Sequence, residues 1–289
     1  MQTQIPLDEF ALADEQIVHG VHEVAPDVAY QRVLVANVVY CGLPGAGDRR
    51  WILIDAGAPG LAGRIRRTAN ERFGHGARPY AIVLTHGHTD HVGTLLTLAR
   101  EWDAPVFAHI SEVPFLNGSM KYPPPDPFAG GMMSLMSPLL SRGPIDIGER
   151  LYALPRDQSI PGMPGWMWVH TPGHTPGHVS LWRPQDRMLI AGDAFITTRQ
   201  ESAYAALISQ RPEMHGPPQY FTPDWQAAKQ SVRELARLEP ETVITGHGFG
   251  MQGAAMRQAL HELAQNFDEI AVPESHKRRA AREAVTSDR

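Results

Sequence analysis

Apolar and polar positions follow one another along the chain in blocks that predict a mixed α/β fold. Strand-like runs at Val33 to Tyr40 and Trp51 to Ile54 precede a Gly/Pro turn and helical spacing of apolar residues near Ala62 to Phe73. The short apolar run AIVLT then leads through a polar segment to a stretch with helical spacing, VGTLLTLAREW, and to another strand-like run, PVFAH. This order of strand, helix and strand is typical of the α/β class.

Four of the predicted strands end in a polar cluster. AIVLT leads into THGHTDH, WMWVH into TPGHTPGH, RMLIAG into Asp193, and TVITG into His247. Functional groups in layered α/β folds gather beyond the carboxyl ends of strands, so we expect the four clusters to meet in space. The recurrence also suggests two related halves, although the sequence itself shows no repeat.

Two stretches interrupt this pattern. Residues 112–144 contain too many prolines and glycines for a long regular element, which predicts an irregular Pro/Met-rich insertion with at most one short helix. Residues 211–224 are also irregular and precede a helix from Trp225 to Leu238. The charged tail from about His276 is expected to be frayed. One domain spanning residues 1–289 accommodates these features, because a single α/β core can reach this size.

Composition and net charge indicate which classes of partner the protein can bind. With a formal net charge of −5 the chain offers no broad basic field, so nucleic acid is disfavoured and a small-molecule substrate is favoured. No segment is apolar for long enough to span a bilayer, and the N-terminus lacks the features of a signal peptide. Cys41 is the only cysteine and is expected to be a small buried side chain. These features favour a cytoplasmic location, and a homodimer remains open.

The segment from His86 to His91 carries the densest set of candidate metal ligands. HGHTDH places three imidazoles and one carboxylate directly after a predicted strand and before a predicted helix. Histidine nitrogen and aspartate oxygen are ligands that zinc accepts readily. The sequence therefore predicts a metal site here.

Four motifs together resemble the ligand motifs of the metallo-β-lactamase superfamily in their usual order. They are THGHTDH, TPGHTPGH, AGDAF and TGHG, and the resemblance covers roughly Val33 to Phe249. It implies the four-layer αβ/βα sandwich of that superfamily and a hydrolase with two Zn2+ ions, with iron or manganese as alternatives. ILIDAG resembles the superfamily's first motif, whose aspartate, here Asp55, supports the ligand loop from behind.

The resemblance also implies a role for each residue. His86, His88 and His174 would hold one metal, Asp90, His91 and His247 the other, and Asp193 would bridge the two. A hydroxide bridging the metals would attack a carbonyl carbon, with Asp90 accepting and returning the proton. TPGHTPGH contains two histidines, of which His174 matches the ligand position, whereas His178 is expected to orient neighbouring groups.

Departures from known branches narrow the reaction. The motifs are most similar to those of the glyoxalase II and lactonase-like bacterial branch. Asp193 stands where penicillin-cleaving enzymes usually have cysteine or serine, which makes β-lactamase activity secondary. Ile196 stands where quorum-signal lactonases have tyrosine, and the 42 residues after His247 are fewer than in glutathione thioesterases. A hydrolase of an ester, lactone or thioester-type carbonyl is therefore predicted, with phosphodiesterase activity as a further secondary option.

Two functions of other kinds are compatible with the sequence. An iron-dependent sulfur dioxygenase uses the same scaffold, and iron in place of zinc in the purified protein would indicate it. A binding protein without activity is disfavoured, because every ligand position is filled.

The insertion at 112–144 is a candidate wall for a substrate pocket. Irregular segments beside a rigid site commonly carry specificity, and thioether and aromatic side chains form adaptable apolar surfaces. A dimer contact is the alternative role of this segment. The candidate wall residues are Phe115, Met120, Tyr122, Phe128, Met132, Met133 and Met136.

Overall fold

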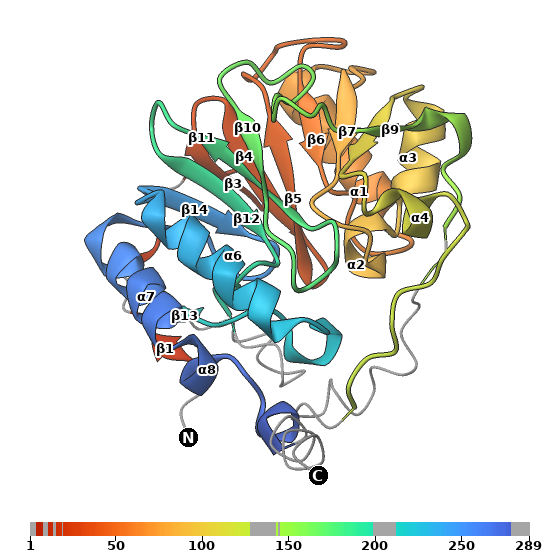
Figure 1. Ribbon diagram of the computed structural model, residues 1–289. Coiled ribbons are helices and arrows are strands. Elements are labelled where there is room, and N and C mark those ends of the chain that lie inside the picture. Colours follow the sequence, from red (N-terminus) through yellow and green to blue (C-terminus); the bar gives the residue numbers. More distant parts are fainter. Residues whose placement is uncertain are drawn as a thin grey trace.

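Two β-sheets packed face to face form the centre of the molecule, and helices cover both outer faces (Figure 1). The computed structural model describes residues 4–7, 11–13, 16–18, 20–127, 143, 145–198 and 212–278. Within these ranges each half of the chain begins with a run of strands and continues with strands and helices in alternation.

The N-terminal sheet contains eight strands in the order β2-β3-β4-β5-β6-β7-β8-β9. Neighbours from β2 to β6 pair antiparallel, whereas β6, β7, β8 and β9 run parallel. The strands are Gln16–Val18, Val21–Ala25, Val28–Val33, Ala36–Cys41, Ile52–Ile54, Ala81–Val83, Val106–Ala108 and Leu151–Ala153.

Helices cover the outer face of this sheet. They are α1 (Ala62–Phe73), α2 (Thr89–Val92), α3 (Leu95–Glu101) and the short α4 (Val113–Leu116). Strand β5 is buried on both faces: Val38 and Tyr40 pack with the residues under α1, whereas Val39 and Cys41 face the second sheet. The Cys41 thiol is accordingly buried and free, as expected from its apolar surroundings in the sequence.

The C-terminal sheet has five strands in the order β10-β11-β12-β14-β15. They are Met167–His170, Val179–Arg183, Met188–Gly192, Thr242–Thr245 and Met251–Gln252. Because β11 is antiparallel to both β10 and β12, and β14 is parallel to β12, strands β10, β12 and β14 all run in one direction. Their carboxyl ends therefore share one edge of the sheet.

The outer face of the C-terminal sheet is covered by α6 (Trp225–Arg237) and α7 (Gly253–Gln265), followed by α8 (Phe267–Ile270). The Asp224 side chain caps α6 by accepting the Ala227 N–H at 2.9 Å. Beside these helices, β1 (Ile5–Pro6) pairs with β13 (Glu213–Met214), and short 3-10 helices occupy Gly148–Arg150 and Gln219–Phe221.

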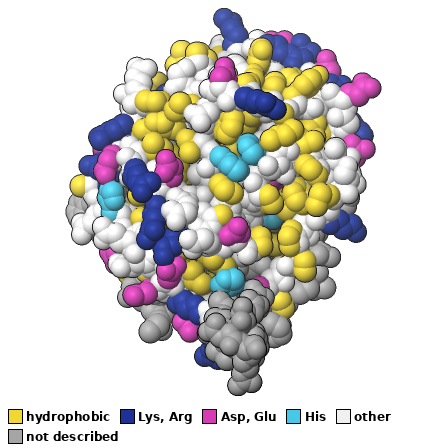
Figure 2. All heavy atoms as spheres, viewed as in Figure 1, with side chains coloured by type: hydrophobic (Ala, Val, Ile, Leu, Met, Phe, Trp, Pro, Cys, Tyr) yellow, Lys and Arg dark blue, Asp and Glu magenta, His cyan; other side chains and the backbone are white. Residues whose placement is uncertain are grey.

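Three hydrophobic cores separate four layers of secondary structure. One core lies between the N-terminal sheet and its helices, one between the two sheets, and one between the C-terminal sheet and α6 and α7. The predicted four-layer αβ/βα sandwich is confirmed. None of the helices in the described ranges is long and apolar enough to cross a membrane. On the face in Figure 2, acidic and basic side chains lie beside one another over α6 and α7.

Most predicted elements are present, with one correction. The run from Val33 to Tyr40 is not one strand, because β4 ends at Val33 and β5 begins at Ala36. Leu34 makes the turn between them with a left-handed φ of 69°. Such turns normally contain glycine or asparagine, and here an uninterrupted apolar run hides the reversal.

Candidate metal centre

Four segments that follow strands converge at one edge of the two sheets. The segment from Thr85 to His91 follows β7, and His174, Asp193 and His247 follow β10, β12 and β14. The common direction of the last three strands delivers their side chains to the same place. The structure brings together all seven side chains for which ligand roles were predicted.

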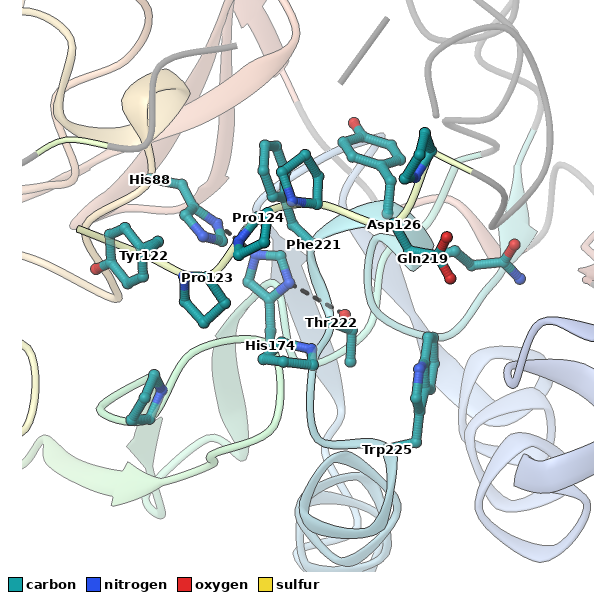
Figure 3. Close-up of a pocket in the computed structure, with 15 residues that line it drawn as sticks. His88, Tyr122, Pro123, Pro124, Asp126, His174, Gln219, Phe221, Thr222 and Trp225 are labelled. Carbon is teal, nitrogen blue, oxygen red and sulfur yellow. Dashed lines mark hydrogen bonds between the residues drawn. The ribbon is translucent and has the colours of Figure 1, made fainter. Parts of the chain in front are cut away.

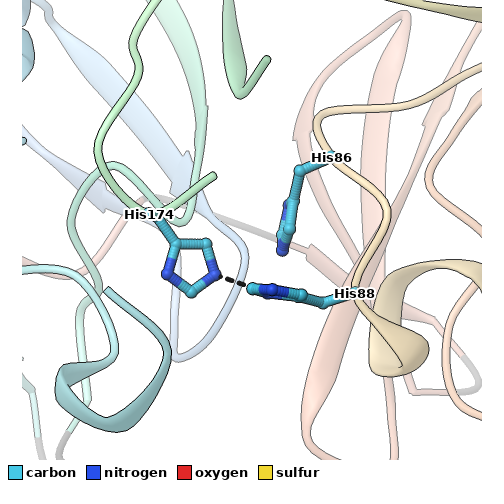
Figure 4. A group of neighbouring side chains, drawn as sticks. All are labelled: His86, His88 and His174. Atoms are coloured by element: carbon cyan, nitrogen blue, oxygen red, sulfur yellow. Dashed lines mark hydrogen bonds between the residues drawn. The ribbon is translucent and has the colours of Figure 1, made fainter. Parts of the chain in front are cut away.

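Three histidines form the first group of the cluster (Figure 4). The rings of His86, His88 and His174 point toward one another, with ligand atoms within 4.8 Å. Nδ1 of His88 lies 2.9 Å from Nε2 of His174. Nε2 of His86 is buried and has no hydrogen-bond partner among the described residues.

Asp90, His91 and His247 form the second group. Nε2 of His247 lies 3.4 Å from Nε2 of His91 and 3.5 Å from Oδ2 of Asp90. His91 and His247 are buried, whereas the Asp90 side chain is 35% exposed. Asp90 therefore lies on the solvent side of the cluster.

Asp193 lies between the two groups. Its Oδ2 is 3.1 Å from Nε2 of His247 and 3.4 Å from Nε2 of His174, and its Oδ1 is 3.6 Å from Nε2 of His91. One carboxylate thus reaches both groups. Gly246 makes room for it, because a Cβ there would stand 1.9 Å from Oδ1 of Asp193.

The donor set and its spacing fit metal ions. A tetrahedral zinc with bonds of about 2.0–2.1 Å holds its ligand nitrogens about 3.4 Å apart. The Nε2 atoms of His91 and His247 are separated by 3.4 Å, and Nδ1 of His88 and Nε2 of His174 are closer, at 2.9 Å. Burial lowers the pKa of His86 and of His174 well below the usual histidine value, and that of His88 to about 4. Burial thus favours the neutral form of these three imidazoles, which metal ligation requires. For His91 and His247, by contrast, the carboxylates of Asp193 and Asp90 outweigh burial and raise the pKa. Buried polar atoms without partners are also costly unless something binds them.

Asp55 supports the cluster from behind. It directly follows β6, and its backbone lies in the left-handed region with a φ of 59°. Its carboxylate accepts the Thr85 N–H at 2.8 Å and the Thr85 hydroxyl at 2.7 Å. Nδ1 of His91 lies 2.8 Å from the same carboxylate. Because the hydroxyl of Thr85 donates to Asp55, it accepts from Nδ1 of His86 at 3.0 Å. Both histidines are thereby held with Nε2 toward the cluster.

Two other histidines have their tautomers set in the same way. Nδ1 of His247 donates to the carbonyl of Val35 at 2.8 Å. The hydroxyl of Thr222 donates to the Pro218 carbonyl at 2.8 Å, so it accepts from Nδ1 of His174 at 3.3 Å. In the neutral form of both rings, Nε2 then carries the lone pair and faces the cluster.

His178 has both ring nitrogens occupied by the protein. Its Nε2 accepts the backbone N–H of Asp193 at 2.9 Å, so Nδ1 donates to the hydroxyl of Thr171 at 2.8 Å. Burial lowers the pKa of His178 to about 3. This neutral histidine therefore holds the backbone at Asp193.

A cavity of about 480 Å³ opens beside the three-histidine group (Figure 3). His88 and His174 lie at one end, and Trp225 and Gln219 lie toward the other. Between them run the proline-rich residues 123–127 and the segment 219–223. The ring of Phe221 packs on His88, with centroids 4.9 Å apart.

Of the residues predicted to form the pocket wall, only some lie at the cavity in the described part of the structure. Tyr122 lines the cavity, and Phe115 stacks behind it with ring centroids 4.1 Å apart. Met120 is 52% exposed and is not part of the cavity wall. The remaining candidates, Phe128, Met132, Met133 and Met136, lie outside the described residues.

Several contributors to the site were missed by sequence reasoning. Thr222, Phe221 and Trp225 lie in or next to an irregular segment without a motif, where apolar periodicity gives no signal. Glu112 was also missed, although it follows shortly after the carboxyl end of β8. The rule that functional groups lie beyond strand ends could have identified it.

Comparison with known proteins places the chain in a family. Residues 33–247 match the family model of the metallo-β-lactamase superfamily. The chain belongs to this superfamily, and the resemblance of its motifs is confirmed.

Relatives and solved structures agree with this placement. "Probable metallo-hydrolase YflN" of Bacillus subtilis (strain 168) is 47% identical over 249 residues, or 86% of this chain and 94% of the relative. A beta-lactamase domain protein from Burkholderia ambifaria shares the fold with a TM-score of 0.61 at 19% identity, over 89% of this chain and 76% of that one. The di-iron-bound form of TTHA1623 has a TM-score of 0.51 at 24% identity, over 80% and 95% of the two chains.

Proposed function

We propose that this protein is a dinuclear metal-dependent hydrolase that acts on an ester, lactone or thioester-type carbonyl. The observation that carries the proposal is the position of Asp193, whose carboxylate lies within 3.6 Å of histidine nitrogens from both ligand groups. A single buried carboxylate shared in this way is suited to bridging two cations. The 47% identical relative bears the name of a probable metallo-hydrolase, which supports the same class of reaction.

His86, His88 and His174 would hold one metal, and Asp90, His91 and His247 the other, with Asp193 shared. Bound metals lower the pKa of water toward about 7 and polarise the oxygen of a substrate carbonyl. We assign zinc first, because imidazole and carboxylate suit it, with iron or manganese as alternatives. The di-iron-bound form of TTHA1623 is the reason to measure iron beside zinc.

Asp90 is the residue we assign to proton transfer. It is the most exposed of the acidic groups in the cluster, and its Oδ2 lies 3.5 Å from Nε2 of His247. A carboxylate at that position can accept a proton from the attacking water and return it to the leaving group.

The cavity beside His88 would receive the acyl part of the substrate. Its described walls consist mainly of proline and aromatic side chains, including Tyr122, Phe221 and Trp225. Among these wall residues there is no lysine or arginine, and Asp126 is the one carboxylate. Such walls favour a neutral, apolar acyl group over one that carries a carboxylate.

A matched pair of substrates tests this proposal. Two aryl esters of equal size, one ending in a methyl group and the other in a carboxylate, are compared beside lactones, thioesters and phosphodiesters. We expect metal-dependent hydrolysis with kcat/KM at least about tenfold higher for the neutral ester, since an unpaired buried charge costs more than one factor of ten. Equal kcat/KM for the neutral and the charged ester would contradict the assignment of the cavity to an apolar acyl group. If the metal-loaded protein hydrolysed none of the compounds in the panel, the proposed reaction itself would be contradicted.

A further inference from the structure

Glu112 is a fully buried carboxylate, 0% exposed, that lies between two ligand-bearing loops without being a ligand itself. Its Oε2 accepts the backbone N–H of Gly87 at 3.0 Å, and its Oε1 accepts the backbone N–H of Gly177 at 2.8 Å. The Thr175 hydroxyl donates to Oε1 at 2.7 Å, and the Tyr122 hydroxyl donates to Oε2. Four donors therefore converge on one side chain.

Three of the four donors belong to the loops that carry one group of histidines. Gly87 lies between His86 and His88, and Thr175 directly follows His174. These loops follow strands of different sheets, and next to them the Val179 N–H donates to the Thr85 carbonyl at 2.9 Å. The Glu112 carboxylate provides a further link between the two loops.

Two glycines allow the backbone to approach Glu112 closely. A Cβ at Gly177 would lie 2.6 Å from the backbone nitrogen of Glu112 and 2.7 Å from its Cγ. A Cβ at Gly87 would lie 2.4 Å from the Tyr122 hydroxyl oxygen. Side chains at either position would push the loops away from the carboxylate.

We propose that Glu112 is a positioning residue for the metal position formed by His86, His88 and His174, as Asp55 is for His91. Glu112 holds the two loops at the separation that one metal ion requires, and it contacts neither metal nor substrate. The proposal rests on the dinuclear site proposed above. It goes further in assigning a second buried carboxylate to the support of the site. Asp55 contacts His91 directly and reaches His86 only through Thr85, whereas Glu112 joins the loops of His88 and His174.

The chemistry of the four contacts requires a carboxylate. Glutamine has the same shape, but its amide nitrogen is a donor. That nitrogen would face the N–H of Gly177 in one orientation and the N–H of Gly87 in the other, and neither backbone N–H can turn away. A buried donor facing a donor leaves both unsatisfied, so one loop must move.

The test compares Zn2+ binding and the absorption spectrum of Co2+-reconstituted protein in the wild type and in Glu112→Gln. We expect about one of the two metals to bind roughly 10–100-fold more weakly in the variant, with a changed Co2+ spectrum. Glu101→Gln is the matched control, because Glu101 is exposed and pairs with Arg66. It should bind both metals as the wild type does.

Double variants locate the effect. Added to His88→Ala, which already damages the first position, Glu112→Gln should cause little further loss of metal. Added to Asp55→Asn, it should weaken the remaining position as well. Equal losses in both backgrounds, or unchanged binding in Glu112→Gln, would overturn the inference.

Two further measurements separate a failure of this inference from misfolding of the variant and from a failure of the proposed function. If Glu112→Gln does not fold, Thr175→Val is measured in its place, because this substitution removes only one of the four donors. It should weaken the binding of the same metal ion by a smaller factor. If Thr175→Val then bound both metals as tightly as the wild type does, the inference would be overturned. A wild-type protein that binds no metal would instead contradict the proposed function, whereas two metals bound equally well by wild type and variant would contradict the role of Glu112 alone.

Discussion

The carboxylate of Asp55 lies 2.8 Å from Nδ1 of His91, and the same carboxylate binds both the backbone and the hydroxyl of Thr85. Asp55 thus holds Thr85, at the start of the ligand loop, and His91, near its end, in fixed positions relative to each other. Its left-handed backbone is compatible with this role, because aspartate tolerates that conformation better than most residues do. The hydrogen bonds around it hold the conformation in place.

Asp55→Asn should weaken chiefly the metal held by Asp90, His91 and His247, because Asp55 contacts His91 directly and His86 only through Thr85. The amide nitrogen of asparagine must face a donor on Thr85 or His91, so the ring of His91 loses its fixed orientation. We expect roughly 10–100-fold weaker binding of one metal, measured by competition with a chromogenic chelator. Asp48→Asn, which alters an exposed pair with Arg78, is the control and should bind metal normally. Unchanged affinity in Asp55→Asn would contradict the supporting role.

His174→Ala and His178→Ala should have different effects, although both residues belong to TPGHTPGH. His174 presents Nε2 to the cluster, so its removal should lower metal content and abolish turnover. Both ring nitrogens of His178 are hydrogen-bonded within the protein, to the Thr171 hydroxyl and to the Asp193 backbone, so its removal should leave metal content largely intact. It should lower the free energy of unfolding by about 1–3 kcal/mol, since a buried N–H loses its acceptor. The reverse pattern in metal analysis and thermal unfolding would show that the two assignments are exchanged.

Asp90→Asn should reduce kcat by orders of magnitude. The substitution removes a ligand charge and the proposed proton carrier in one step. Metal content and kcat are measured together, and kcat is compared at equal occupancy to separate the two losses. A rate close to that of the wild type at equal occupancy would exclude Asp90 from proton transfer.

Gly246→Ala should disrupt the shared carboxylate without unfolding the protein. The added Cβ would meet Oδ1 of Asp193 at 1.9 Å and Cε1 of His91 at 2.9 Å, so both side chains must shift. Loss of metal binding with a native circular dichroism spectrum is expected. Gly63→Ala in α1 is the matched control, because no atom lies within 4 Å of its added Cβ. Normal metal binding by Gly246→Ala would mean that Asp193 does not need its present position.

The sequence predicted those parts of the fold that depend on local pattern. The helix α1 and the apolar strands before the four polar clusters were visible, because burial on one or both faces imposes a repeating order of residues. The turn at Leu34 was not visible, since a left-handed leucine inside an apolar run leaves no composition signal. The pairing of strands from different halves depends on long-range packing that no short window contains.

The same distinction applies to the site. The ligand candidates stand in dense motifs, and the shared direction of β10, β12 and β14 explains why they meet. Their metal-binding roles stay predictions until metal is measured. Glu112 accepts hydrogen bonds from two loops, and Thr222 accepts one from the ring of His174, and these partners are distant in sequence. No motif surrounds Thr222, whereas the place of Glu112 shortly after the end of β8 is the one sequence feature that could have pointed to it.

The number of metal ions bound per chain tests the central claim most directly. Protein reconstituted with Zn2+ and freed of excess metal is analysed by plasma mass spectrometry, with Asp193→Ala measured in parallel. We predict about two ions per chain in the wild type and a clear loss in the variant, because Asp193 is shared by both positions. A wild-type value near zero, or an Asp193→Ala variant that retains the wild-type value, would contradict a dinuclear centre at this site.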